Sequence, residues 1–159
     1  MEYASLIAEF GANYGLGDLT PDENGAVGFE VDGRPVVIQQ LAETQTVVVT
    51  IDLYEAPESG AAAVNQLLLK ANLALFVLDG MALVLHPENN RYRLVMRLDV
   101  ATTDFIEFDD KMSKLLDRAE QWSAFLDKFL PLVAEAETKG VKSEAMSTEM
   151  LPEFEMLRI

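Results

Sequence analysis

The hydrophobic pattern of residues 61–78 predicts a helix that is apolar on two opposite sides. At about 100° per residue, a second apolar stripe lies nearly opposite the first. The first stripe holds Val64, Leu67, Leu68, Ala71, Leu75 and Leu78, and the second holds Ala62, Leu69, Leu73 and Phe76. A helix that is apolar all round must be covered on both sides. One side can pack on the protein's own sheet, so we expect the second stripe to form an interface with another chain.

The pattern along the rest of the chain predicts seven further elements. Apolar residues at helical spacing (Tyr3, Leu6, Ile7, Phe10, Tyr14) mark a first helix, and alternating residues mark strands over residues 27–31, 36–41 and 46–54. A hairpin follows over residues 81–85 and 91–100. A long helix begins near Asp104, which forms a capping-box-like pair with Glu107, and Pro131 should end or kink it. The order α-β-β-β-α-β-β-α predicts an α+β domain with helices packed on a twisted antiparallel sheet.

A break at Lys139-Gly140 divides the chain into a domain over residues 1–138 and a C-terminal tail over residues 139–159. The tail carries apolar groups among glutamates: Met146, Met150, Leu151, Phe154 and Leu157. This pattern is typical of an amphipathic segment that docks into an apolar groove, and a disordered tail is the alternative.

Charge and composition limit the classes of partner. The chain has 159 residues, 50% of them hydrophobic and none cysteine, and a formal charge of −15. Such a negative field repels nucleic acids and anionic lipid and favours basic or polar partners, although solubility alone would also explain it. The longest apolar stretch contains Lys70, Asn72 and Asp79, which argues against a membrane span. The opening Met1-Glu2-Tyr3 is acidic and unlike a signal peptide, so we expect a cytoplasmic protein.

Residues suited to catalysis or to metal and cofactor binding are few. His86 is the single histidine and lies beside Pro87 in the expected hairpin turn, which predicts an exposed turn residue and no catalytic base. We therefore predict no catalytic residue, no cofactor and no metal site. Arg91, Arg93 and Arg97 form a basic row on one strand, too small for a nucleic-acid footprint. Cross-strand pairing with acidic neighbours is the favoured interpretation, and contact with a protein partner is the alternative.

Several segments together resemble the class I type III secretion chaperones, the Tir-chaperone family of Gram-negative bacteria. The resemblance covers about residues 3–130. It rests on Gly15-Leu16-Gly17-Asp18-Leu19, the turn from Asp22 to Gly25, Phe29-Glu30-Val31-Asp32-Gly33, Leu67-Leu68-Leu69-Lys70-Ala71-Asn72-Leu73, and Ala119-Glu120-Gln121-Trp122.

The resemblance implies a homodimer built largely on the second helix, where the two apolar stripes were found. It also implies a partner: the N-terminal segment of a secreted effector, bound in extended form by strand addition and kept soluble and secretion-competent. By position, the candidate groove residues are Leu6, Phe10, Phe29 and Val31. The family catalyses no reaction and uses no nucleotide. The tail departs from the shorter family pattern, and we expect it to cover an apolar groove when the effector is absent.

Two other functions fit the same pattern. A YbjN-like domain resembles this fold but serves as a regulatory or general interaction module with no secreted client. An enzyme or small-molecule binder could use the sheet face, since an apolar pocket with few polar groups suits a lipid-like ligand.

Overall fold

The computed structural model describes residues 2–41 and 44–139, and the tail after Lys139 lies outside this part of the chain. Its elements run α1 (Tyr3–Tyr14), β1 (Ala26–Val31), β2 (Arg34–Gln40), β3 (Thr46–Glu55), α2 (Ala61–Asp79), β4 (Met81–Leu85), β5 (Arg91–Asp99) and α3 (Phe105–Thr138). The predicted α+β class and the predicted order of elements are confirmed.

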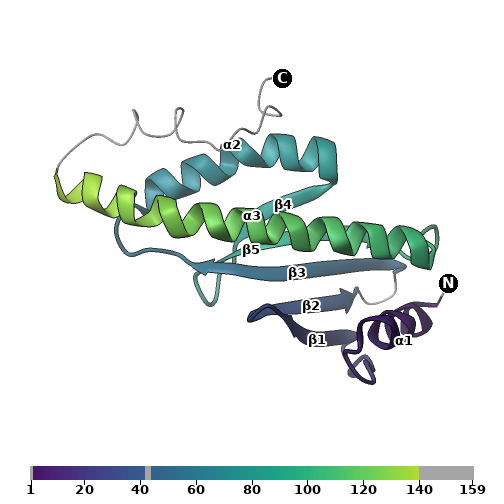
Figure 1. Ribbon diagram of the computed structural model, residues 1–159. Helices are drawn as coiled ribbons and strands as arrows, with labels where there is room; N and C mark the ends of the chain where they lie inside the picture. The colour runs from purple at the N-terminus through teal and green to yellow at the C-terminus, as the bar shows by residue number, and fades with distance from the viewer. Residues whose placement is uncertain (1, 42–43, 140–159) are drawn as a thin grey trace.

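The five strands form one antiparallel sheet in the order β1-β2-β3-β5-β4, so β1 and β4 are its two edges. The chain leaves β3, crosses through α2 and returns as β4 on the far side of β5. Helix α3 runs across the middle of the sheet, α2 lies toward the β4 edge, and α1 lies beside β1 and β2 (Figure 1). The two edges of the sheet therefore meet different helices.

The core contains the expected alternate strand residues and one stripe of each helix. On β3, Val47, Val49, Ile51 and Leu53 are buried, and the alternate residues of β5 are buried as well: Tyr92, Leu94, Met96 and Leu98. The first stripe of α2 is confirmed from Val64 to Leu75 but fails at Leu78, which is 49% exposed. Leu78 lies in the last turn of α2, just before the reversal at Gly80, where the core no longer covers the helix.

Helix α3 does not end at Pro131, so the expectation of a helix end there is wrong. The helix continues through this residue to Thr138, with Asp104 accepting the expected capping bond from the Glu107 amide at 2.8 Å. Proline removes one backbone bond, but Leu130 and Val133 on either side are buried and keep the last turns packed. The packing is close: a Cβ added to Gly60, which has a φ of +78°, would lie 2.2 Å from Val133 Cγ1.

Helix α1 is tied to the β1 edge by Tyr3 and Phe10. The Tyr3 hydroxyl lies 3.0 Å from the Gly25 carbonyl oxygen and 3.1 Å from that of Ile38, so one phenol reaches the backbone beside β1 and in β2. The Phe10 ring packs against Phe29 of β1 and edge-on against Phe108 of α3. These contacts make α1 part of the core and fix its position beside the edge strand.

Burial, together with the nearby Asp22 carboxylate, raises the pKa of Tyr3 to about 12. An unfolded tyrosine titrates near pH ~10. The neutral phenol therefore stabilises the folded state fully below about pH 10, and this contribution is lost as the pH rises through about 12. We predict that the free energy of unfolding of the wild type falls more steeply over this range than that of Tyr3→Phe, by about 1–2 kcal/mol in total. Denaturant titrations at a series of pH values measure it, and parallel pH profiles would contradict it.

Candidate protein-binding surfaces

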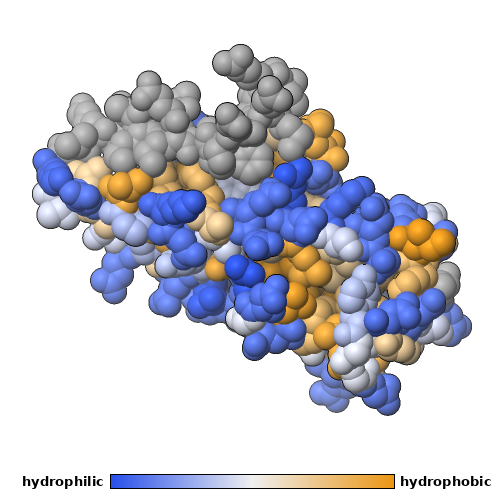
Figure 2. All heavy atoms as spheres, in the orientation of Figure 1, coloured by the Kyte–Doolittle hydropathy of each residue, from blue (hydrophilic) through white to orange (hydrophobic). Residues whose placement is uncertain are grey.

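The outward side of α2 is an exposed apolar surface. Leu69 is 71% exposed, Leu73 64% and Phe76 70%, and Ala62 is exposed at the start of the same helix. The α2 outer face, as we define it, comprises Ala62, Leu69, Leu73, Phe76 and Val77. Part of its C-terminal end is visible in Figure 2 as orange spheres at the place where α2 ends in Figure 1. The four residues predicted for an interface therefore lie on the surface, while the opposite stripe of the helix is in the core.

Sequence reasoning missed Val77 as a member of this surface. Val77 extends it along α2. Val84 and Leu85 of β4, at 38% and 42% exposed, form a separate apolar surface, since Val84 follows the buried Leu83 and so points to the face of the sheet away from α2. The signal for Val77 was the apolar run itself, whereas the surface on β4 depends on strand order and had no local signal.

By length and composition alone, α2, with 19 residues, could cross a membrane, since an 18-residue window within it has a mean hydropathy of 1.6. The polar residues Lys70, Asn72 and Asp79 therefore do not make the helix too polar to meet this criterion. Its inner stripe packs in the core, however, and the Asn72 side chain bonds to the backbone of β4. A helix held in this way has only its outer face available for contact.

The second surface is the free edge of β1. Asp22 bonds to both backbone groups of Ala26: its carboxylate accepts from the Ala26 amide, and its own amide donates to the Ala26 carbonyl. The amide and carbonyl of Ala26 therefore point away from β2. Alternation along the strand places the backbone groups of Gly28 and Glu30 on the same outward side. Within the described part of the chain, neither residue has a partner on that side. The edge is closed at its start by Asp22 and open further along.

The predicted groove residues all lie near this edge but differ in access. Leu6 is completely buried and Phe10 is 2% exposed, so both contribute to the core of the unliganded protein. Phe29 and Val31 on β1 are half-buried and pack against that core from the edge. A partner could reach these two residues without any rearrangement of α1.

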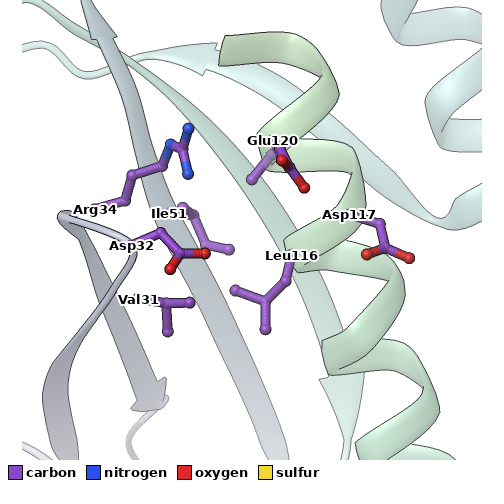
Figure 3. Close-up of a pocket in the computed structure, with 8 residues that line it drawn as sticks. Val31, Asp32, Arg34, Ile51, Leu116, Asp117 and Glu120 are labelled. Carbon is purple, nitrogen blue, oxygen red and sulfur yellow. The ribbon is translucent and has the colours of Figure 1, made fainter. Parts of the chain in front are cut away.

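A hollow of about 150 Å³ lies between the β1–β2 turn and α3 (Figure 3). Val31, Ile51 and Leu116 contribute its apolar wall. Its polar lining combines Asp32 and Arg34 of the turn with Asp117 and Glu120 of α3. The Arg34 Nε group donates to Ser123 Oγ at 3.1 Å, which holds the guanidinium beside the hollow. The hollow thus continues the β1 edge and suits a side chain of mixed polarity.

The basic row on β5 pairs within the protein, as the favoured interpretation predicted. The Asp52 carboxylate on β3 lies 2.7 Å from Arg91 Nε and 2.6 Å from Arg93 Nε. Arg97 instead donates to the Thr46 hydroxyl at 3.2 Å. Asp52 and Thr46 both lie on β3, so the arginine row links β5 to its neighbour β3.

His86 occupies the expected hairpin turn. Its Nδ1 accepts a bond from the Glu88 amide at 3.3 Å, a contact that shapes the turn. Among the described residues, no group of three or more His, Asp or Glu could hold a metal ion. The turn contact gives His86 a structural role.

An antiparallel sheet with one open edge and one uncovered apolar helix face is typical of a protein-binding domain. The Tir chaperone protein (CesT) family model matches residues 5–123, and the chain belongs to this family. A search of curated protein sequences finds no match.

Solved structures agree with this assignment. The chain is similar to one in the ExsC–ExsE complex, with a TM-score of 0.68 and 25% identity over 78% of this chain and 96% of that one. A chain of the HopA1–SchA chaperone–effector complex gives 0.66 and 16% over 77% and 93%. The Yersinia pestis type III secretion chaperone SycH, bound to a fragment of YscM2, gives 0.58 and 20% over 76% and 98%. The fold is that of type III secretion chaperones.

We predict that Asp52→Asn destabilises the protein by about 1–2 kcal/mol, because the Asp52 side chain is only 12% exposed and faces two guanidinium groups. Asp110→Asn is the matched control: Asp110 pairs with Lys114 on an exposed helix surface, and its loss should cost under about 0.5 kcal/mol. Urea denaturation of both variants measures the difference. Equal effects would contradict the structural role of the arginine row.

Proposed function

We propose that this protein is a type III secretion chaperone that binds the N-terminal segment of a secreted effector in extended form. It keeps that segment soluble and secretion-competent in the cytoplasm of a Gram-negative bacterium, and it catalyses no reaction. Membership of the Tir chaperone family supports this function. Similarity to chains from the ExsC–ExsE and HopA1–SchA complexes supports an effector as the partner.

The open edge of β1 is the observation that carries the binding mode. The outward amide and carbonyl groups of Gly28 and Glu30 can pair with an added strand, and Gly28 has no side chain to obstruct its approach. Alternate side chains of that strand would face Phe29 and Val31, and the next would reach the hollow beside Arg34. Leu6 and Phe10 would join the groove only if α1 moved, so Phe29 and Val31 are its first contacts.

The α2 outer face is the proposed homodimer interface. Its large apolar side chains are mostly exposed in the single chain, and their position opposite the core stripe leaves them no partner within the described part of the protein. Packing against the same face of a second copy would remove this surface from water, which is the dominant favourable term in such association. A twofold arrangement suits a single self-complementary patch.

The dimer is tested by Leu73→Asp. A charge in the middle of the apolar interface should weaken dimerisation by at least about 2 kcal/mol and give a monomer at micromolar concentration. The core stripe is untouched, so the circular dichroism of the folded chain should persist. Ala8→Asp is the control, since Ala8 is exposed on α1, which lies beside the opposite edge of the sheet. Light scattering measures the masses, and a wild-type monomer or a dimeric Leu73→Asp variant would contradict the interface.

The binding mode is tested by two substitutions at Glu30. Glu30→Pro removes the outward amide that an added strand would use, and an edge strand tolerates proline. Glu30→Ala removes the same side chain and charge but keeps the amide. We expect Glu30→Pro to weaken binding of an effector N-terminal segment about tenfold and Glu30→Ala to change it less than about twofold.

The measurement requires co-expression with candidate effectors, co-elution of an effector segment with the chaperone, and titration of that segment. Equal affinities for the two Glu30 variants would exclude strand addition at β1. If no secreted segment co-elutes with the folded protein, the chaperone function itself fails, and a general interaction module of the YbjN-like kind becomes the better proposal.

A further inference from the structure

Strand β4 is the second edge of the sheet, and an exposed edge is a template for pairing with another chain. It is short, and the side chains of Val84 and Leu85 near its end are apolar and exposed. Its free side would therefore be suited to pairing with a second copy or with an extended peptide. Natural proteins suppress this hazard with an explicit device.

The side chain of Asn72 supplies such a device. Its Oδ1 accepts a hydrogen bond from the Leu83 amide at 2.6 Å, and its Nδ2 donates to the Leu83 carbonyl at 2.9 Å. Leu83 lies at the centre of β4, opposite Leu94 of β5. One primary amide thus satisfies both outward backbone groups of one residue, as the backbone of a neighbouring antiparallel strand would do.

We propose that Asn72 seals the β4 edge by occupying the position of a neighbouring strand. The seal keeps β4 closed to strand pairing, so that contacts on this side of the protein are made by the α2 outer face alone. The inference rests on the fold and on these two bonds, and it does not depend on which partner the protein binds.

The position of Asn72 on α2 explains why this residue can act in this way. It is half-buried and lies between Ala71, which is in the core, and Leu73, which is on the outer face. A longer side chain would overreach the strand and an aliphatic one would leave two backbone groups without partners. The contact on β4 is at its central residue, whereas the Asp22 contact on β1 is at Ala26, the first residue of the strand, so the successive outward groups of Gly28 and Glu30 stay open.

The decisive experiment compares wild type with Asn72→Ala, using Asn13→Ala as the control. Asn13 is an exposed amide on α1 and makes no side-chain hydrogen bond among the described residues. We expect the Leu83 amide of Asn72→Ala to exchange at least roughly fivefold faster, the effect of losing one hydrogen bond. Light scattering should detect species larger than those of the wild type that grow with protein concentration. Asn13→Ala should match the wild type in both measurements.

Two further variants separate sealing from general stability. Adding Val84→Lys to Asn72→Ala places a charge on the edge strand, and it should return the mass to that of the wild type although the amide is still missing. Asn72→Asp retains the acceptor for the Leu83 amide, so it should keep slow exchange there, and it decides the question if Asn72→Ala does not fold. Unchanged exchange at Leu83 in Asn72→Ala, or faster exchange with no larger species, would overturn the proposal.

Discussion

The structure depends on one constraint: α2 has to cross from β3 to β4 while it carries apolar groups around its whole circumference. Its inner stripe from Val64 to Leu75 packs in the core, which fixes the helix on the sheet. That packing turns Asn72 toward the β4 edge and leaves Leu73 pointing away from the protein. The angular position of a residue on this one helix therefore decides whether it packs in the core, bonds to the β4 edge or is exposed on the outer face.

The arginines pair within the protein, whereas carboxylates are in excess over the chain as a whole. Each of the five arginines in the described part of the chain contacts a side chain of another element. The pairs are Arg91 and Arg93 with Asp52, Arg97 with Thr46, Arg118 with Asp79, and Arg34 with Ser123. These contacts leave the net charge unchanged, so the excess of carboxylates sets the sign of the field outside. The formal charge of −15 therefore favours basic or polar partner segments and repels polyanions.

The element order, the core faces of the strands and the doubly apolar helix could be predicted from the sequence, because each follows from local periodicity. The exceptions have non-local causes. Pro131 does not end α3 because Leu130 and Val133 are held by tertiary packing, with Val133 against Gly60. Leu78 keeps the helical period of the core stripe, but the core stops before the last turn of α2.

The candidate surfaces show the same limit more sharply. Periodicity placed Leu6 and Phe10 on an apolar face, but it cannot tell a side chain that covers a groove from one that lines it. Only the contacts of Phe10 with Phe29 and Phe108 place it in the core. Likewise, the role of Asn72 needs the pairing of β4 with β5, which brings Leu83 to an edge eleven residues further along the chain. No pattern within α2 contains that information.

The strand order also separates the two surfaces in space. Because β1 and β4 are opposite edges of the sheet, the open edge at Gly28 and Glu30 lies away from the α2 outer face, which adjoins β4. A dimer joined through α2 would therefore leave both β1 edges outermost and free, one on each copy. An extended segment long enough to pass round the dimer could contact both edges, and the gain in effective concentration would strengthen its binding without any new kind of contact. In this arrangement, sealing β4 and leaving β1 open are two parts of one requirement, since a strand that paired at β4 would interfere with the surface that brings the two copies together.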